Sequence, residues 1–248
     1  MTTKHLFAAL SILYVFASCN KNNSSESSGN TTKLKLYIED VQASGYHETD
    51  SFAVNYDNNN RITSMVSPNG KFVYTYSDKS FTLDLYNNNQ LSIHEILYLN
   101  NIPYVDSTFQ VNDTNDSTTE KYTYNGKLLT RVTTYDYSKS GTTVFSRSDY
   151  TYDNDGNLIK DIETDGSGTV NTISTYTYTN HRLNMPIDPI YYPLQSKYFP
   201  ATQKQTDGAG NVIANVTYSY LFDSSGRITK ETDMLDNGEV ATKTYIYN

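Results

Sequence analysis

Apolar and polar residues alternate along most of this chain. In residues 212–222 (VIANVTYSYLF) the even positions are all apolar or aromatic, and Asn215, Thr217 and Ser219 fall on the opposite face. Residues 120–124, 148–152 and 174–178 repeat the alternation, and each segment ends with two tyrosines two positions apart. A period of two, carried by β-branched and aromatic residues, predicts half-buried β-strands. We find no sustained helical period after residue 18.

Short polar breaks separate these segments, and one phrase recurs in them. Residues 150–159 (YTYDNDGNLI), 220–229 (YLFDSSGRIT) and 54–63 (VNYDNNNRIT) share an aromatic ring, an Asp, three small polar residues, an Arg or Asn, and then an aliphatic residue. Gly and Asn accept the positive φ of tight hairpin turns, and an Asp side chain can accept N–H groups two residues on. The phrase therefore predicts a hairpin, with the ring and the aliphatic residue as cross-strand neighbours on the core face.

A second turn phrase, at residues 164–170 and again at 206–212, alternates with the first along the chain. Strands of about seven to eleven residues join the turns. The aligned aromatic residues stand at 56, 152 and 222, so the spacing is uneven and a regular solenoid is disfavoured. The sequence predicts an all-β fold: an up-and-down antiparallel meander of hairpins, strongly twisted or closed into a barrel-like sheet.

The N-terminus has a different composition. One lysine, Lys4, precedes an apolar stretch that runs to Ser18, and the single cysteine of the chain, Cys19, follows. This predicts a signal peptide over residues 1–18, too short to span a bilayer as a helix. Residues 16–19 (FASC) resemble a bacterial lipobox, although the pattern prefers Leu at the position of Phe16. The resemblance implies a lipid on the Cys19 thiol; the alternative is a secretory leader with an incidental cysteine.

Residues 20–32 (NKNNSSESSGNTT) contain no apolar side chain and are expected to form a disordered tether, reaching roughly 20 Å. The expected organisation is therefore a leader at 1–18, a lipidated Cys19 with its tether at 19–32, and one β-meander domain at 33–248. Asn20 follows the cysteine, where Asp typically retains lipoproteins of Gram-negative bacteria at the inner membrane. The resemblance thus implies an exported outer-membrane lipoprotein, facing either the periplasm or the cell surface.

The recurring phrase also resembles a known repeat. Residues 150–158 are similar to the YD (Rhs) repeat, Y-x-Y-D-x-x-G-R-L, and residues 222–228 and 56–62 match it with single changes. The chain more closely resembles a family of Gram-negative lipoproteins of similar length that are known only for a porin-like fold. That resemblance covers most of the chain after the leader, and it implies no functional residues.

Candidate chemistry is sparse. His94 and Glu95 begin like a zinc-protease helix, but Tyr98 stands where the second histidine is required. Residues 153–157 have the composition of a calcium loop without its distal glutamate, and turn formation explains them. His181 is expected in a turn, solvated. We therefore expect no catalytic residue, no metal site and no cofactor. A net charge of −8 disfavours nucleic acid as a partner.

One segment interrupts the meander, the proline-rich loop at 185–200 (MPIDPIYYPLQSKYFP), which holds four of the six prolines. Proline removes sheet donors, so this segment is not a central strand. It is expected either to cover an open end of the sheet or to contact a ligand or partner. Its aromatic residues are the candidate contacts: Tyr191, Tyr192, Tyr198 and Phe199.

Three functions remain open at this point. The first is a binding or scaffold module of the cell envelope, held to a membrane by its lipid, with a glycan or protein ligand. The second is a small porin-like channel; residues 142–152 argue against it, because neither face of that strand suits lipid. The third is a hydrolase of a polymer with unidentified carboxylates. The first is favoured, because no catalytic constellation is present.

Overall fold

The computed structural model describes residues 33–100, 104–112, 117–138, 141–183 and 196–248. These residues form sixteen antiparallel strands and no helix. The strands are β1 (Leu34–Ala43), β2 (Tyr46–Tyr56), β3 (Ile62–Val66), β4 (Gly70–Tyr76), β5 (Ser80–Asn87), β6 (Gln90–Leu99), β7 (Val105–Asn112), β8 (Ser117–Asn125), β9 (Leu128–Ser138), β10 (Gly141–Tyr152), β11 (Leu158–Asp165), β12 (Val170–Arg182), β13 (Tyr198–Asp207), β14 (Val212–Phe222), β15 (Ile228–Leu235) and β16 (Val240–Tyr247).

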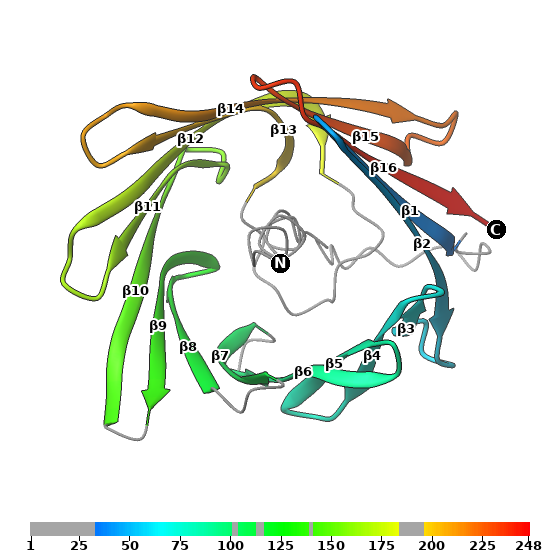
Figure 1. Cartoon of the computed structure of the whole chain (residues 1–248), viewed down its shortest axis with the longest axis horizontal. Coiled ribbons are helices and arrows are strands. Elements are labelled where there is room, and N and C mark those ends of the chain that lie inside the picture. Colours follow the sequence, from blue (N-terminus) through cyan, green and yellow to red (C-terminus); the bar gives the residue numbers. More distant parts are fainter. Residues whose placement is uncertain (1–32, 101–103, 113–116, 139–140, 184–195) are drawn as a thin grey trace.

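Each strand pairs with its neighbours in sequence, and β1 pairs with β16 to close a barrel (Figure 1). The closing seam runs from Leu34 opposite Tyr247 to Gln42 opposite Val240. The predicted up-and-down meander is therefore confirmed, and the sheet closes. Closure removes both edges of the sheet, which would otherwise present unpaired N–H and C=O groups.

The predicted hairpins form, and both turn phrases use the same hydrogen bonds. In five turns the Oδ1 atom of an Asp accepts the N–H groups of the residues two and four positions on, at 2.8–3.0 Å. These residues are Asp57, Asp153, Asp165, Asp207 and Asp223. The residue three positions after each Asp has a φ between 63° and 91°, which Gly or Asn adopts readily.

The ring and the aliphatic residue of the first phrase are cross-strand partners, as predicted. Tyr152 faces Leu158, Phe222 faces Ile228, and Tyr56 faces Ile62. The first phrase joins strands at the end of the barrel where β1 begins and β16 ends, which we call the latch end. The second phrase joins strands at the opposite end. The alternation of phrases along the sequence is therefore the alternation of the two barrel ends.

Tyrosine hydroxyls tie neighbouring strands together at the latch end. Six of them, each at or near the end of an even-numbered strand, donate to the carbonyl of the first or second residue of the strand before, at 2.5–3.0 Å. These latch tyrosines are Tyr56, Tyr76, Tyr124, Tyr152, Tyr178 and Tyr247. The arrangement explains why two of the three copies of the phrase, at Tyr56 and Tyr152, place a tyrosine directly before the turn.

The arginines of the phrase complete this end. Arg61 bonds back to Asp57 at 2.7 Å and lies over the ring of Tyr76, 4.3 Å from its centroid. Arg227 stands over Tyr247 in the same way, at 4.5 Å. Each arginine therefore covers the latch tyrosine of the next hairpin, and the cation–π contact adds to the ion pair.

Two apolar clusters lie near the latch end. One contains Leu34, Leu183, Phe199, Ile228 and Tyr245, and the other contains Phe81, Leu97 and Val105. Most of these residues stand at the beginning or end of a strand. The fully apolar part of the core is therefore concentrated toward one end of the barrel.

Replacing Tyr152 with Phe is expected to lower the free energy of unfolding by about 1 kcal/mol, because the Leu129 carbonyl loses its phenol donor at 2.7 Å. Urea denaturation followed by tyrosine fluorescence measures the change. The matched control is Tyr137→Phe, at a tyrosine that is 42% exposed. An equal loss in the two variants would show that the latch contributes nothing specific.

Candidate functional site: the inner face of the barrel

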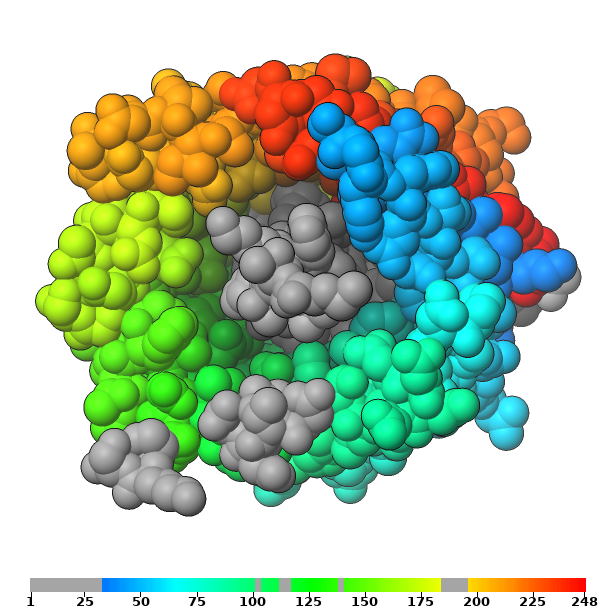
Figure 2. Space-filling model, viewed as in Figure 1, coloured from blue at the N-terminus to red at the C-terminus, as the bar shows by residue number. Residues whose placement is uncertain are grey.

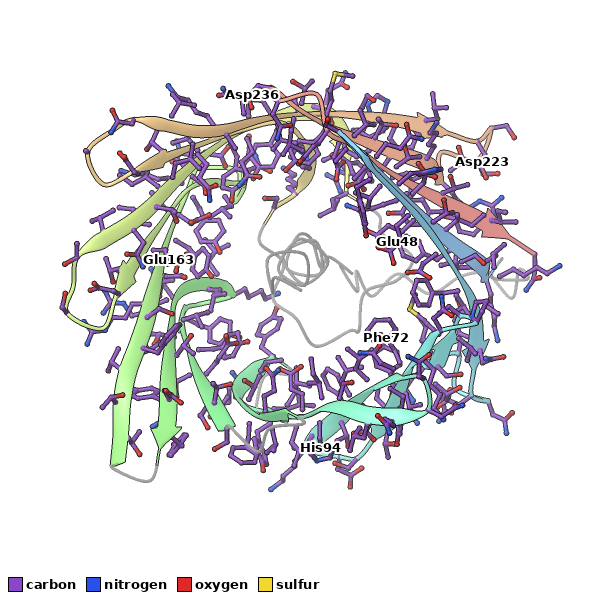
Figure 3. The ribbon with its side chains drawn as sticks, viewed as in Figure 1. Glu48, Phe72, His94, Glu163, Asp223 and Asp236 are labelled. Atoms are coloured by element: carbon purple, nitrogen blue, oxygen red, sulfur yellow. The ribbon has the colours of Figure 1, made fainter. Side chains whose placement is uncertain are left out.

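Strand alternation and cross-strand register assign the side chains to an inner and an outer face. Figure 3 shows Glu48 and Phe72 on the side of the wall toward the barrel axis and His94 on the outside. Cross-strand partners share a face, so the inner or outer assignment of these three residues also applies to the residues paired with them around the wall. In the space-filling view the described strands form a ring around the barrel axis (Figure 2).

The inner face between β14 and β2 carries a row of polar side chains that lie opposite one another. Tyr220 pairs with Glu231, Glu231 with Lys243, Lys243 with Glu39, and Glu39 with Asp50. The next row toward the opposite end runs Tyr218, Asp233, Ala241, Val41 and Glu48. These two rows therefore carry five carboxylates and one ammonium group, that of Lys243.

Lys243 is the centre of this group. Its Nζ atom donates to Glu231 Oε1 at 2.7 Å and to Asp233 Oδ2 at 3.1 Å. The side chains of Lys243 and Glu231 are 8% and 2% exposed, so both charges are withdrawn from water. A buried ion pair is stable only when its remaining polar atoms find partners. The surroundings of the pair therefore decide whether it stabilises the barrel.

Burial and the neighbouring charges both shift the pKa values of Asp233, Glu39 and Lys243. Burial raises the pKa of Asp233, and nearby Glu231 raises it further, against the attraction of Lys243. Burial also raises the pKa of Glu39. Burial lowers the pKa of Lys243, but the carboxylates of Glu231 and Asp233 outweigh it, so the net pKa is raised. Lys243 is therefore charged throughout the physiological range.

A second acidic pair lies on the other side of the barrel, where β7 separates β6 from β8. Glu95 faces Gln110 on β7, and Glu120 faces Thr108 on the same strand. Burial, with a contribution from Glu120, raises the pKa of Glu95 to about 7. Burial raises the pKa of Glu120 too, although the Tyr122 hydroxyl donates to it at 2.6 Å.

A chain of hydrogen bonds crosses the inner face from β14 to β11. The Tyr218 hydroxyl donates to Gln203 Oε1 at 2.8 Å, and Gln203 Nε2 lies 3.4 Å from the Tyr176 oxygen. The Tyr176 hydroxyl in turn donates to Asp161 Oδ2 at 2.7 Å. Burial raises the pKa of Tyr176 well above its ordinary value, so this phenol stays protonated and remains a donor. Inner-face tyrosines thus act as hydrogen-bonding groups as well as core residues.

The outer face is polar along the middle of the strands. Its outward positions hold many threonines: Thr75, Thr82, Thr119, Thr123, Thr133, Thr175, Thr177, Thr202, Thr217, Thr232, Thr242 and Thr244. Arg131 and Asp149 form an outer ion pair at 2.6 Å. Apolar side chains also lie on the outer face, singly as at Leu221, which pairs with Lys230, or as cross-strand pairs, Ile96 with Phe109 and Ile162 with Ile173. A strand that faces lipid needs a continuous apolar band, which the described strands do not provide.

The predicted site residues fall partly outside the described part of the chain. Cys19, Tyr191 and Tyr192 lie outside it, so the lipid and the ligand contacts proposed for them stay predictions. Tyr198 is half-buried, with Lys197 Nζ 5.4 Å from its ring centroid. Phe199 is buried, and its ring lies 4.7 Å from that of Tyr220.

Three sequence-based placements need correction. The proline-rich loop was expected to extend to residue 200, but β13 begins at Tyr198, and Pro200 pairs with Tyr178 across a register shift, where a missing N–H is tolerated. His181 lies in β12 instead of a turn, and its exposed ring stacks on Phe222 at 4.7 Å. Val212 was expected on the core face, but it is half exposed beside the β13–β14 turn.

The end of the proline-rich segment contacts the turn after β10. The Lys197 N–H donates to Asn157 Oδ1 at 2.9 Å, and Ser196 Oγ accepts the Leu158 N–H at 3.2 Å. Asn157 is 3% exposed and stands where the other copies of the phrase carry arginine. The phrase therefore carries Asn at this position because the returning chain occupies the space that an arginine would fill.

Two stretches were considered as metal sites in the sequence, at His94 and at Asp153, and both lie in the described residues. No group of three or more His, Cys, Asp or Glu there could hold a metal ion. His94 lies on strand β6, where its Nδ1 atom is 2.6 Å from Asp84. Asp153 uses its carboxylate to hold the turn, as predicted. A search of the same described ranges for helices finds none of the length and hydrophobicity needed to cross a bilayer.

The sequence did not reveal the inner carboxylates as a group. Glu231, Asp233 and Lys243 have the alternation of a strand, but charged residues in a strand ordinarily face water. Ile228 and Glu231 are an odd number of positions apart, so strict alternation would place them on opposite faces of the strand. The register shift between Leu221 and Phe222 allows Ile228, Glu231 and Asp233 to share the inner face. A sequence pattern alone does not show that shift.

Comparison with known proteins supports the barrel architecture. No family model matches the sequence, and no curated protein matches it. A porin-like protein from Bacteroides uniformis ATCC 8492 superimposes with a TM-score of 0.64 at 14% identity, covering 87% of this chain and 96% of the other. A porin-like protein from Bacteroides vulgatus ATCC 8482 gives 0.63 at 13% identity, covering 88% and 99%.

The fold is therefore that of a porin-like β-barrel, which agrees with the resemblance noted in the sequence. At these identities the likeness concerns the fold alone. A putative outer membrane lipoprotein-sorting domain from Vibrio parahaemolyticus reaches a TM-score of only 0.30, which supports no comparison. None of these comparisons shows a relation to YD-repeat proteins.

Proposed function

We propose that this protein is a lipid-anchored binding module of the bacterial cell envelope, whose barrel stands in water and takes its ligand on the inner face. One observation carries the proposal: the outer wall is rich in threonine and charge, whereas the inner wall carries carboxylates, phenols and a buried lysine. A wall of this polarity suits solvent outside and a polar ligand inside.

The anchor would be the lipid on Cys19, and the location the outer membrane, facing the periplasm or the cell surface. The ligand would be a glycan, a protein segment or a smaller polar molecule. The proposal is of binding, not catalysis: Glu231 bonds to Lys243, Asp161 to Tyr176 and Glu120 to Tyr122.

A porin-like channel is the second candidate, because the closed barrel has the fold of two porin-like proteins. The two candidates differ in what holds the barrel at the membrane. An anchored module depends on the lipid of Cys19, whereas a channel is held by its own outer wall.

The experiment compares the full chain with a Cys19→Ser variant in which an ordinary cleavable secretory leader replaces residues 1–18, both exported in a Gram-negative host. The anchored module predicts that the unchanged chain incorporates labelled palmitate and sediments with membranes, and that Cys19→Ser is a soluble periplasmic monomer. A Cys19→Ser protein that still sediments with membranes and leaves them only in detergent would refute the proposal and favour the channel. An exposed-site control, Asp78→Asn, should behave as the unchanged chain.

A further inference from the structure

We propose that the inner face between β14 and β2 binds an organic cation, such as a primary ammonium or guanidinium group, at the Lys243 cluster. This cluster consists of Glu39, Tyr220, Glu231, Asp233 and Lys243. The inference rests on the proposed function and names the chemistry of the ligand for the same inner face.

The members of the cluster are adjacent across four strands. Tyr220, Glu231, Lys243 and Glu39 lie directly opposite one another from β14 through β15 and β16 to β1. Side chains directly opposite in an antiparallel sheet have Cβ atoms about 4.5–5.5 Å apart. Asp233 lies two positions along β15 from Glu231 and bonds to the same ammonium group. The five polar side chains therefore form one continuous patch.

Three buried polar atoms of this patch have no hydrogen-bond partner. They are Glu39 Oε1, Tyr220 Oη and Asp233 Oδ1, and no other buried side-chain atom in the described residues is left unpaired. Asp233 is only 8% exposed, so its free oxygen is shielded from water. An unpaired buried polar atom costs about 1–3 kcal/mol, more when it is charged. Because all three atoms belong to one patch, we infer that a bound ligand supplies their hydrogen-bond partners.

The charge of the patch specifies that group. Glu231 and Asp233 bond to one ammonium, and Glu39 lies opposite it on β1. Two of these three carboxylates, Glu39 and Asp233, offer the unpaired acceptor atoms. The adjacent inner residues Asp50 and Glu48 are also acidic. A neutral polyol would donate hydrogen bonds to these acceptors but would leave the excess negative charge of the patch uncompensated. A cation both donates to the acceptors and compensates the charge.

Aromatic rings beside the patch suit the carbon part of such a ligand. Tyr37 lies between Tyr245 and Phe52, with ring centroids 5.6 and 6.1 Å away. Tyr37 is the neighbour of Glu39 on the inner face of β1. Ring faces attract ammonium and guanidinium groups, and they also cover alkyl chains. In the described ranges no carboxylate group is arranged to hold a metal, which favours an organic cation over a divalent ion.

Isothermal titration calorimetry of the full chain, extracted in mild detergent, tests the inference with 1,4-diaminobutane as the probe. 1,4-Butanediol is the neutral control of the same length, and a panel of neutral oligosaccharides represents the other ligand class. The diamine is expected to bind about tenfold or more tightly than the diol. Its affinity should fall as the pH is lowered from 8 to 5, because the carboxylates that receive it become protonated.

Two variants separate ligand binding from folding. Glu39→Gln and Tyr220→Phe each remove an unpaired group, so neither breaks a hydrogen bond and both are expected to melt at or above the temperature of the unchanged chain. Each should nevertheless weaken the diamine about tenfold or abolish its binding. Asp78→Asn, exposed in the β4–β5 turn, removes a carboxylate elsewhere and should change neither quantity.

The outcomes distinguish a wrong ligand assignment from a wrong proposed function. Binding of the diamine that both variants weaken supports the inference. Equal binding of the diol, or binding of an oligosaccharide without the diamine, overturns the organic cation and leaves the binding module in place. Diamine binding that Glu39→Gln and Tyr220→Phe do not affect overturns the assignment to this patch. If no probe binds and Cys19→Ser stays in the membrane, the proposed function and the inference both fail.

Discussion

Replacing Lys243 with Met is expected to lower the free energy of unfolding at pH 8 by about 3–5 kcal/mol. Methionine fills a similar volume, so the loss arises from charge. Lys243 Nζ donates to Glu231 and Asp233 at 2.7 and 3.1 Å, and its removal leaves two buried carboxylates without a cation. The loss should shrink toward pH 5, since a carboxylate without its cation takes up a proton more readily. Urea denaturation at the two pH values measures both effects.

The control for this variant is Lys204→Met, an exposed lysine on the outer face of β13, which should change stability by less than about 0.5 kcal/mol. The double variant Lys243→Met with Glu231→Gln should recover part of the loss, because one buried charge leaves with the lysine. A loss that is the same at pH 5 and pH 8 would mean that packing, not charge, explains the effect.

Replacing Glu95 with Gln is expected to stabilise the barrel at pH 8 by on the order of 2–3 kcal/mol. Burial, together with Glu120, raises the pKa of Glu95 from 4.5 to about 7. Between these values the folded chain binds a proton that the unfolded chain has released, so the stability contributed at low pH is lost as the pH rises through 7. Glutamine does not titrate and avoids that loss.

Thermal denaturation of the two proteins between pH 4 and pH 8 checks the sign. The curves should nearly coincide near pH 4 and separate above pH 5, with the variant melting higher. Asp78→Asn is the matched control, because it removes an exposed carboxylate and should show no such separation. A variant that melts lower than the unchanged chain at pH 8 would show that ionised Glu95 contributes a favourable contact.

Local chemistry made the hairpins predictable. The Asp57, Asp153 and Asp223 turns follow from side-chain acceptors and residues that tolerate positive φ, both of which are visible in the sequence. Cross-strand partners such as Tyr152 and Leu158 then follow from the turn geometry. The number of strands and the closure of β1 on β16 did not follow, because pairing across the whole chain leaves no local mark.

The candidate site was much less predictable than the fold. The ordinary expectation places a charged residue of a strand in water, yet Glu231 and Lys243 face inward and are buried. Only the partners across the wall show that these charges belong together. The predicted half-buried strands captured only part of the role of their tyrosines, since Tyr176 and Tyr218 also pass hydrogen bonds along the inner face.

The seam between β1 and β16 has a consequence for how the molecule is made. The N–H of Asn248 reaches the carbonyl of Lys33 at 3.0 Å, beside a seam of paired residues from the two ends of the barrel. Until β16 is in place, β1 and β15 each have an edge of unpaired backbone N–H and C=O groups, which can pair with strands of other molecules. Closure of the wall therefore depends on β16 pairing with β1 before either edge pairs with another molecule, and removing one terminal strand should increase aggregation.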